Sequence, residues 1–347
     1  MLRNYSKTAW RNLLRNKGFA FTNLVSLTIG ITATILILLW VQSELSWDKF
    51  QKNYNNTYQE YANRDYNGTI NSDFSIMLPL GDALKQELPE VKNAVFTSYS
   101  EDHVLAVGEK KLRMRGYRAG KSFFDLFSYV LLHGDLKNAL VSPDAIVITK
   151  STAIALFNSV DAVNKVLKLD NRHDVKVTAV IEDVPQNATQ SFAFITPYNY
   201  AEREMLDWTN AYSSLYVQTA DNTSPELFEA KMNALVRRRS NNTHSSYHLH
   251  PMSKWRLYSE FRDGKNVGGM ITYVKLFSVI ALVILLIGCI NFMNLSTARS
   301  EKRAREVGIR KTLGSARTQL MKQFFSESIL LSFVSFLVSL GVTYLVM

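Results

Sequence analysis

Three histidines lie close together in the stretch His-Ser-Ser-Tyr-His-Leu-His, residues 244–250, and residues of this type at this spacing can bind a metal ion. Neutral imidazole nitrogens suit Zn or Cu. In a strand, however, only His248 and His250 would point to the same face, because successive side chains alternate. No cysteine or carboxylate lies within the stretch. The sequence therefore predicts no metal site here.

Other chemistry that needs a defined set of side chains is not predicted either. The phosphate-binding pattern Gly-x-x-x-x-Gly-Lys-Ser/Thr is not found in the 347 residues. No Ser, His and Asp arrangement and no pair of carboxylates stands out. Arg237–Arg239 end a predicted helix, where cations interact favourably with the helix dipole, so they do not require an acidic partner. We expect no catalytic residue and no directly bound cofactor, and we do not expect an enzyme.

The most unusual group of side chains is the stretch Glu301–Leu320, which holds six Lys or Arg residues, two Glu residues, and glycines at 308 and 314. Contact with anionic lipid, worth about 1 kcal/mol per cation, would explain the charge alone. It does not explain the glycines, which are possible helix breaks, or the apolar residues near one helical face: Ile309, Leu313, Leu320 and Phe324. These features favour a short amphipathic helix that docks into a groove of another protein. Both roles remain open.

This basic stretch lies between long apolar runs. Phe19–Val41 has no charge in 23 residues, Leu276–Leu295 has none in 20, and Ser328–Met347 has none in 20. A helix needs roughly 20 apolar residues to cross a bilayer. The first run is too long for the core of a cleaved signal, and no small-residue cleavage site follows it. We therefore expect membrane helices over 19–42, 273–295 and 325–347, with the sequence ending inside the third.

The charge distribution predicts the orientation. Residues 1–20 hold five basic and no acidic residues, and residues 296–323 hold eight basic and two acidic ones. Residues 43–273 hold 26 basic and 27 acidic ones, so the net charge of +10 comes mainly from the two short segments. Short basic segments stay in the cytoplasm, whereas long domains are translocated regardless of charge. We expect 1–18, an amphipathic surface helix, and 296–323 inside, and 43–270 outside. Binding to nucleic acid is not indicated.

The outer segment alternates strand and helix patterns, which predicts an α+β domain with two lobes. The membrane-proximal lobe covers about 43–100 and 210–260, and an inserted lobe covers about 101–209. Predicted features include a turn at Asn67-Gly68, a helix that ends at Pro89, two strands joined by residues 170–174, and a helix with Ser224 as N-cap and Pro225 next. Cys289 is the one cysteine, so no intrachain disulfide forms. About 230 residues suffice for a core.

Small residues recur along two of the apolar runs. Four-residue or similar spacing puts them on one helical face, and such faces let helices approach closely. The residues are Ser26, Gly30 and Thr34 in the first run, and Ser328, Ser332, Ser335 and Ser339 in the third. We found no ionisable residue inside the runs, where one would suggest a path for a polar solute. Packing seams within or between subunits are therefore expected.

Three separated pieces of the chain resemble the MacB and FtsX-like family of ABC transporter permeases. They are WRNLLRNKGFAFTNLVSLTIGI at the first crossing; the outer series ELSWDKF, FFDLFSYVLLHGD, IVITKSTAIALF and VTAVIEDVP; and NLSTARSEKRAREVGIRKTLGSARTQLMKQFFSES. The last contains the Arg-Glu-x-Gly-Ile-Arg-Lys-x-Leu-Gly pattern of the family. Two departures stand out. Asn164 occupies a position where relatives are expected to have Gly. The family normally has four crossings, or two such halves in tandem, whereas we expect this sequence to end within its third crossing.

The resemblance implies a bacterial inner-membrane protein with a MacB-type periplasmic core domain between its first two helices. It implies a separate cytosolic ATPase that binds Mg-ATP and grips the basic segment, and a second copy or homologous half as dimer partner. A periplasmic adaptor, an outer-membrane channel and membrane lipid are further expected partners. The residues expected to couple to the ATPase are Glu301, Arg305, Glu306, Gly308, Ile309, Arg310, Lys311, Leu313 and Gly314.

The resulting expectation is a non-catalytic permease subunit that transmits ATP-driven movement to its periplasmic domain. The resemblance implies export or release of a hydrophobic or peptide-like compound, such as a drug, an antimicrobial peptide or a lipoprotein. The alternative is an FtsX-like or sensor-type membrane regulator that transmits a signal across the membrane.

Overall fold

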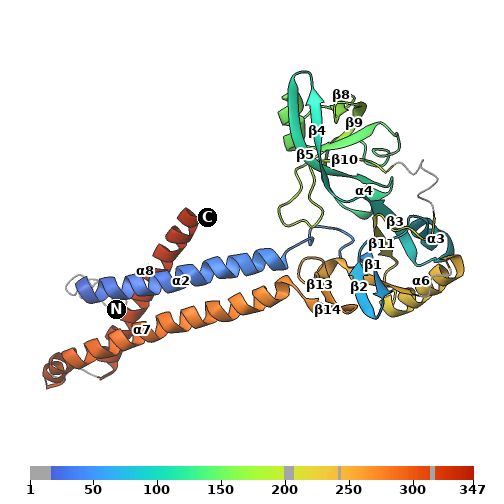
Figure 1. The fold of residues 1–347 in the computed structure, drawn as a ribbon. Helices are drawn as coiled ribbons and strands as arrows, with labels where there is room; N and C mark the ends of the chain where they lie inside the picture. The colour runs from blue at the N-terminus through green and yellow to red at the C-terminus, as the bar shows by residue number, and fades with distance from the viewer. Residues whose placement is uncertain (1–16, 199–206, 241–243, 313–316) are drawn as a thin grey trace. The chain divides into compact units, whose positions relative to one another are not determined.

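The computed structural model describes residues 17–198, 207–240, 244–312 and 317–347, and these form two compact units. One unit comprises residues up to Ser43 together with Thr272–Met347, and we call it the helical unit. The other is Glu44–Ile271, which we call the outer domain. Figure 1 shows the ribbon of both units, coloured from blue at the N-terminus to red at the C-terminus.

Three long helices make up the described part of the helical unit: α2 (Lys17–Leu45), α7 (Met270–Thr312) and α8 (Arg317–Val346). The stretches long and apolar enough to cross a membrane are Ala20–Leu45, Met270–Ala298 and Phe325–Val346. In lipid the backbone N–H and C=O groups have no water to bind, so they must hydrogen-bond to one another. An uncharged run of this length achieves this by forming a helix. The prediction of three membrane helices around an inserted α+β domain is confirmed.

The basic segment 296–323 is more regular than the expected loop. Residues up to Thr312 continue α7 without interruption, and residues from Arg317 onward open α8. Residues 313–316 between them lie outside the described part of the chain. Ala, Arg, Lys and Glu are good helix formers, which explains why the helix extends beyond its apolar part.

The first part of the outer domain is a sheet with strand order β3-β11-β1-β12, in which β2 also pairs with β1. All these pairings are antiparallel. Helices α3 (Pro79–Glu87) and α6 (Pro225–Ser240) pack against this sheet. The strands are β1 (Thr57–Tyr66), β2 (Thr69–Asp73), β3 (Val91–Thr97), β11 (Ser214–Thr219) and β12 (Ser245–Pro251).

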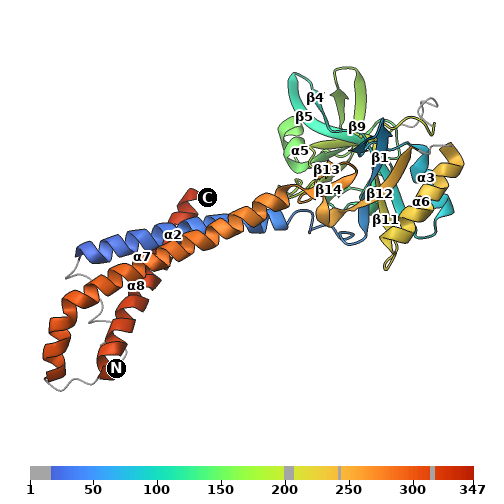
Figure 2. The ribbon, with the colours of Figure 1, turned by 60° about the horizontal axis from the view of Figure 1, so that its bottom comes forward.

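The second part is a six-stranded barrel that continues the same sheet. The order is β5-β4-β8-β9-β7-β10, and a parallel pairing of β10 with β5 closes the ring. Figure 2 shows it beside the first part. Its strands are β4 (Glu101–Val107), β5 (Lys110–Ala119), β7 (Ala145–Thr149), β8 (Val166–Leu169), β9 (His173–Ile181) and β10 (Phe194–Pro197). Further elements are α4 (Phe123–Leu126), β6 (Leu131–Gly134), α5 (Lys150–Phe157), η2 (Met252–Lys254) and the hairpin β13 (Glu260–Arg262) and β14 (Lys265–Gly268).

Three clusters of buried side chains hold the outer domain together. One lies between the first sheet and helices α3 and α6 and includes Leu84 and Phe228. A second is formed around barrel strands and includes Ile148. The third, the shared core, takes residues from both parts, among them Tyr117 of β5 and Tyr216 of β11. Because the shared core buries side chains from both lobes, the lobes form one unit.

Helix α6 also covers the outer edge of the sheet. The Asn233 side chain accepts a hydrogen bond from Tyr247 N at 2.8 Å and donates one to Tyr247 O at 2.7 Å. Glu229 Oε1 accepts another from Leu249 N at 2.8 Å. These side chains replace a neighbouring strand along β12, which protects an edge that could otherwise pair with another chain.

Several local predictions are confirmed. The chain turns at Asn67 and Gly68, both at positive φ, between β1 and β2. Helix α6 begins at Pro225, with Ser224 Oγ accepting from Leu227 N at 3.4 Å. Asn164, which stands where glycine was expected, has φ of 67°. Asparagine tolerates this left-handed conformation better than most residues, so the turn is kept.

Candidate functional site

The proposed coupling residues from Glu301 to Lys311 lie in the last part of α7. Gly308 lies inside the helix and does not break it, because a single glycine costs only about 1 kcal/mol among good helix formers. A Cβ added to Gly308 would meet nothing within 4 Å, and Ile309 is 58% exposed. The remaining predicted coupling positions lie outside the described side chains or residues: Glu301, Arg305, Glu306, Arg310, Lys311, Leu313 and Gly314.

The length of α7 is the main geometric feature of this region. Its 43 residues correspond to about 65 Å at 1.5 Å per residue, roughly twice the hydrocarbon thickness of a bilayer. The apolar part ends at Ala298, so 14 further residues continue as helix to Thr312. One helix therefore joins the basic segment directly to a membrane-length span.

Helices α2 and α7 meet along the predicted small face of α2. Asn291 Nδ2 donates a hydrogen bond to Ser26 Oγ at 2.5 Å. Thr34 Oγ1 donates to the Ala281 carbonyl oxygen at 3.3 Å. Between them, a Cβ built on Gly30 would lie 3.8 Å from the Gly288 Cα, so the two backbones are in close contact. Ser26, Gly30 and Thr34 thus all face α7.

Helix α8 contacts α2 at Thr28, which lies between Ser26 and Gly30 in the sequence. Thr28 Oγ1 lies 3.5 Å from the Ser335 carbonyl oxygen, and Ser339 Oγ donates to Thr28 O at 3.2 Å. Ser335 and Ser339 are fully buried, whereas Ser328 and Ser332 are only partly buried. The buried stripe of α8 follows a strict four-residue spacing: Glu327, Leu331, Ser335, Ser339 and Thr343.

Among the buried polar residues of these helices that the sequence did not indicate, Glu327 and Asn23 stand out. Glu327 directly precedes the uncharged run Ser328–Met347, lies near one end of the span Phe325–Val346 and is 6% exposed. Asn23 in α2 is fully buried, and its amide has no partner among the described residues. A buried polar residue in a lipid-facing helix is costly, which marks both as candidates for a role.

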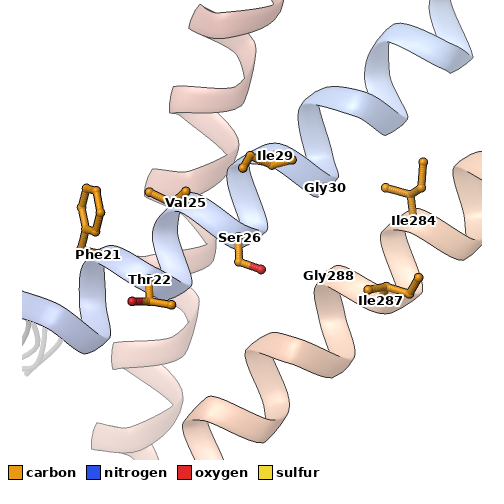
Figure 3. Close-up of a pocket in the computed structure, with 9 residues that line it drawn as sticks. All are labelled: Phe21, Thr22, Val25, Ser26, Ile29, Gly30, Ile284, Ile287 and Gly288. Atoms are coloured by element: carbon orange, nitrogen blue, oxygen red, sulfur yellow. The ribbon is translucent and has the colours of Figure 1, made fainter.

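A groove between α2 and α7 lies beside the small-residue contact. It has a volume of about 530 Å³ and is lined mainly by apolar side chains, as Figure 3 shows. Ser26, Gly30 and Gly288 line it together with Phe21 and Ile29, whose side chains are exposed. Because this groove lies between two membrane-length helices and its walls are mainly apolar, it is suited to contact with the hydrocarbon chains of lipid.

In the outer domain, His248 and His250 do share one face of β12, as the strand pattern predicted. His248 stacks on Tyr61 with ring centroids 5.3 Å apart, and His250 meets the same ring edge-on at 6.3 Å. His248 Nδ1 lies 3.0 Å from Glu229 Oε2. Within residues 17–198, 207–240, 244–312 and 317–347, no group of three His, Cys, Asp or Glu is placed to hold a metal ion.

The Arg237–Arg239 cluster ends α6, and two of its members pair with one carboxylate. Arg238 and Arg239 hydrogen-bond to the two oxygens of Glu87 at 2.8 and 2.7 Å. These hydrogen bonds hold the pKa of Glu87 below its usual value, with the bond from Arg239 as the largest cause. The cluster therefore joins α6 to α3 within the domain.

The sequence did not predict the burial of several ionisable groups of the outer domain, among them Glu60, His250 and Asp48. Glu60 is fully buried without a hydrogen-bond partner among the described residues, and burial raises its pKa well above the usual value. Burial lowers the pKa of His250 to about 4. Burial also raises the pKa of Asp48, although hydrogen bonds from Thr189 oppose the shift. A period-two pattern does not reveal such groups, since a charged residue in it is normally assigned to the exposed face.

Three membrane-length helices with an α+β domain inserted after the first are the architecture of a membrane protein. The model of the MacB-like periplasmic core domain family matches residues 20–235, and that of the FtsX-like permease C-terminal family matches residues 278–347. The chain belongs to the MacB and FtsX-like family of ABC transporter permeases. It is therefore an integral membrane protein with an extracytoplasmic segment.

Individual relatives are distant. The macrolide export ATP-binding/permease protein MacB of Pasteurella multocida is 23% identical over 311 residues, covering 88% of this chain and 46% of that protein. The uncharacterized ABC transporter permease YknZ of Bacillus subtilis is 28% identical over 201 residues, covering 57% of this chain and 47% of that protein. The chain thus spans about half the length of the curated relatives it matches.

A solved structure supports the fold of the outer domain. The crystal structure of a domain of a permease protein from Porphyromonas gingivalis aligns with a TM-score of 0.51 at 18% sequence identity. The alignment covers 66% of this chain and 99% of that domain. At this identity the likeness concerns the fold alone.

Proposed function

We propose that this chain is the membrane subunit of an ABC transporter and passes ATP-driven movement from a separate cytosolic ATPase to the outer domain. The observation that carries the proposal is the continuity of α7 from Met270 to Thr312. A helix is stiff along its axis, so a displacement of its basic end moves the membrane span as well. A flexible loop at 296–312 would absorb the same displacement.

The charges support the direction of this transfer. The basic segment 296–323 and the basic residues before α2 would lie on the cytoplasmic side, where an ATPase is found. This orientation puts the N-terminus inside and the outer domain in the periplasm. Amphipathic character in the basic segment, with Ile309 exposed for contact, suits docking into a groove of the ATPase.

The substrate class follows only from the relatives. The Pasteurella relative is named as a macrolide export protein with ATP-binding and permease activity. We propose that this chain likewise takes part in export or release of a hydrophobic or peptide-like compound. The working unit would be a dimer of two such subunits with two ATPases, to which a periplasmic adaptor and an outer-membrane channel are added.

The proposal is tested first by purification of the chain from native membranes and identification of bound proteins by mass. An ABC ATPase among them is expected, and an adaptor beside it would favour export. A preparation that contains a histidine kinase or a cell-wall hydrolase but no ABC ATPase would instead support a membrane regulator.

Substitutions in α7 then test the coupling. Gly308→Pro should interrupt the helix, since proline in a helix interior costs about 3 kcal/mol or more. Gly308→Ala is the matched control, because its Cβ meets nothing within 4 Å. We expect Gly308→Pro, and charge reversal at Arg310 and Lys311, to uncouple ATP hydrolysis from transport in vesicles without loss of the protein from the membrane. Full transport by these variants would refute the assignment.

A further inference from the structure

Three consecutive residues of the outer domain, Trp255–Leu257, each contact a different element, and we call them the junction segment. They follow η2 and precede the hairpin that leads into α7. All the contacts described below lie within Glu44–Ile271, which includes the last two residues of α2 and the first two of α7.

The middle residue, Arg256, holds the end of α2. Its Nε donates to Glu44 Oε2 at 2.7 Å and its Nη2 to Glu44 Oε1 at 3.0 Å, so the pair is bidentate. Glu44 lies in the last turn of α2 and is 7% exposed. The guanidinium also stacks over the Trp47 ring, 4.1 Å from its centroid. The hydrogen bonds to Glu44 raise the pKa of Arg256. A bidentate pair fixes direction as well as distance.

The first residue, Trp255, belongs to the shared core. It is 6% exposed, and its Nε1 donates to the His250 carbonyl oxygen at 2.8 Å. Its ring packs on Tyr216 at 5.3 Å and on Phe127 at 6.3 Å between centroids. Because the shared core contains residues from both the sheet and the barrel, displacement of Trp255 acts on both lobes.

The third residue, Leu257, holds the start of α7. Its carbonyl oxygen accepts a hydrogen bond from Ile271 N at 3.0 Å. The chain between them is tightly folded at Gly269, which has a φ of +138° and where a Cβ would lie 3.0 Å from Ser259 N. A side chain at 269 would therefore be strained, and the start of α7 has little freedom relative to Leu257.

We propose that the junction segment is where the outer ends of α2 and α7 act together on the outer domain, with Glu44 and Arg256 as the positioning pair. This inference rests on the proposed function, since it assigns the residues that receive the movement. Both helices attach to one three-residue segment, so a shift of either is passed to Trp255. The pair is buried on the Glu44 side, and loss of one partner would leave an uncompensated charge there.

The test uses the chain co-purified with its ATPase in lipid nanodiscs. Cys289→Ser removes the one native thiol, and Val166→Cys, at a position 54% exposed on β8, receives a fluorescent label. We expect Mg-ATP to change the fluorescence relative to Mg-ADP. In Glu44→Gln and Arg256→Gln the fluorescence with Mg-ATP should equal the fluorescence with Mg-ADP, while the complex continues to hydrolyse ATP. The charge swap Glu44→Arg with Arg256→Glu should restore part of it.

A matched control is Arg64→Gln, which removes another bonded arginine, paired to Asp73 at 3.0 Å, in the same domain. It should leave the fluorescence change intact. Unaltered signals in Arg256→Gln and Glu44→Gln would overturn the role of the junction segment alone. A wild-type complex that shows no nucleotide-dependent change would overturn the proposed function and this inference together. If Arg256→Gln does not fold, the nucleotide-dependent fluorescence change is measured in Arg256→Lys and in the charge swap instead, because both keep opposite charges at the site.

Discussion

Gly30 of α2 and Gly288 of α7 face one another so closely that a Cβ on Gly30 would lie 3.8 Å from the Gly288 Cα and 3.8 Å from the Ile284 carbonyl oxygen. That distance is ordinary van der Waals contact, so a methyl group fits, whereas a side chain that extends further toward α7 would displace it. Close approach of this kind is how helices associate in lipid, where no hydrophobic force drives them together.

Gly30→Leu should therefore push α2 and α7 apart and lower the stability of the helical unit by about 1–3 kcal/mol, as overpacking commonly does. Gly30→Ala should be tolerated. Thermal unfolding in detergent measures both effects. Gly341→Leu is the control, because a Cβ on Gly341 would meet nothing within 4 Å. Equal melting temperatures for Gly30→Leu and Gly341→Leu would contradict the packing described here.

Asn291→Leu should remove the hydrogen bond to Ser26 that joins α7 to α2. Hydrogen bonds between membrane helices contribute about 0.6 kcal/mol on average and up to about 1.7 kcal/mol, so a loss in this range is expected. Asn294→Leu changes an exposed asparagine on the same helix and should cost little. Urea or thermal unfolding of the two variants side by side makes the comparison. A larger loss for Asn294→Leu would show that α7 faces α2 differently.

Glu60 should make the outer domain less stable as the pH rises. Its pKa in the folded chain is raised well above 4.5, so the unfolded chain loses this proton first, and unfolding is favoured as the pH increases from about 4.5 up to the folded pKa. Glu60→Leu removes the buried carboxyl and should stabilise the protein at pH 7.5 by about 1–3 kcal/mol. The gain should shrink at pH 4.5. Glu60→Gln cannot ionise but keeps an unpaired polar group. It therefore separates the cost of ionising the buried carboxyl from the cost of burying an unpaired polar group.

His250 should act in the opposite direction. Its pKa is lowered to about 4 in the folded chain against an ordinary value of 6.5, so acid favours the unfolded, protonated form between pH 6.5 and 4. His250→Phe, which fits beside Tyr61 and Phe261, should remove this part of the acid sensitivity in melting temperatures measured across that range. His173→Phe, an exposed position, should not. An unchanged pH profile in His250→Phe would mean that other groups cause the acid loss.

Several features of the protein could be predicted from the sequence. The uncharged runs identify three membrane-length helices, because the bilayer sets the required length and forbids unpaired backbone groups. The turn at Asn67-Gly68 and the start of α6 at Pro225 follow from local backbone preferences. The pattern around Gly308 identifies the family, which comparison with known proteins bears out.

The basic segment shows where local reasoning was insufficient. Gly308 suggested a break, yet α7 passes through it, because the cost of one glycine is small against the propensities of its neighbours. In α8 as well, the residues buried within this chain are Glu327, Leu331, Ser335 and Ser339, whereas Ser328 and Ser332 of the predicted stripe are only partly buried. Residue size alone does not determine which stripe is buried.

By itself, the sequence determined the number of membrane-length helices, the insertion of a large α+β domain and the family. These depend on composition and spacing along the chain. Only the tertiary structure decided that β10 closes the barrel on β5, that Glu60 is buried, and that Arg256 reaches Glu44, 212 residues away. Contacts between residues far apart in sequence depend on how the elements pack, and no local pattern of residue types encodes that packing.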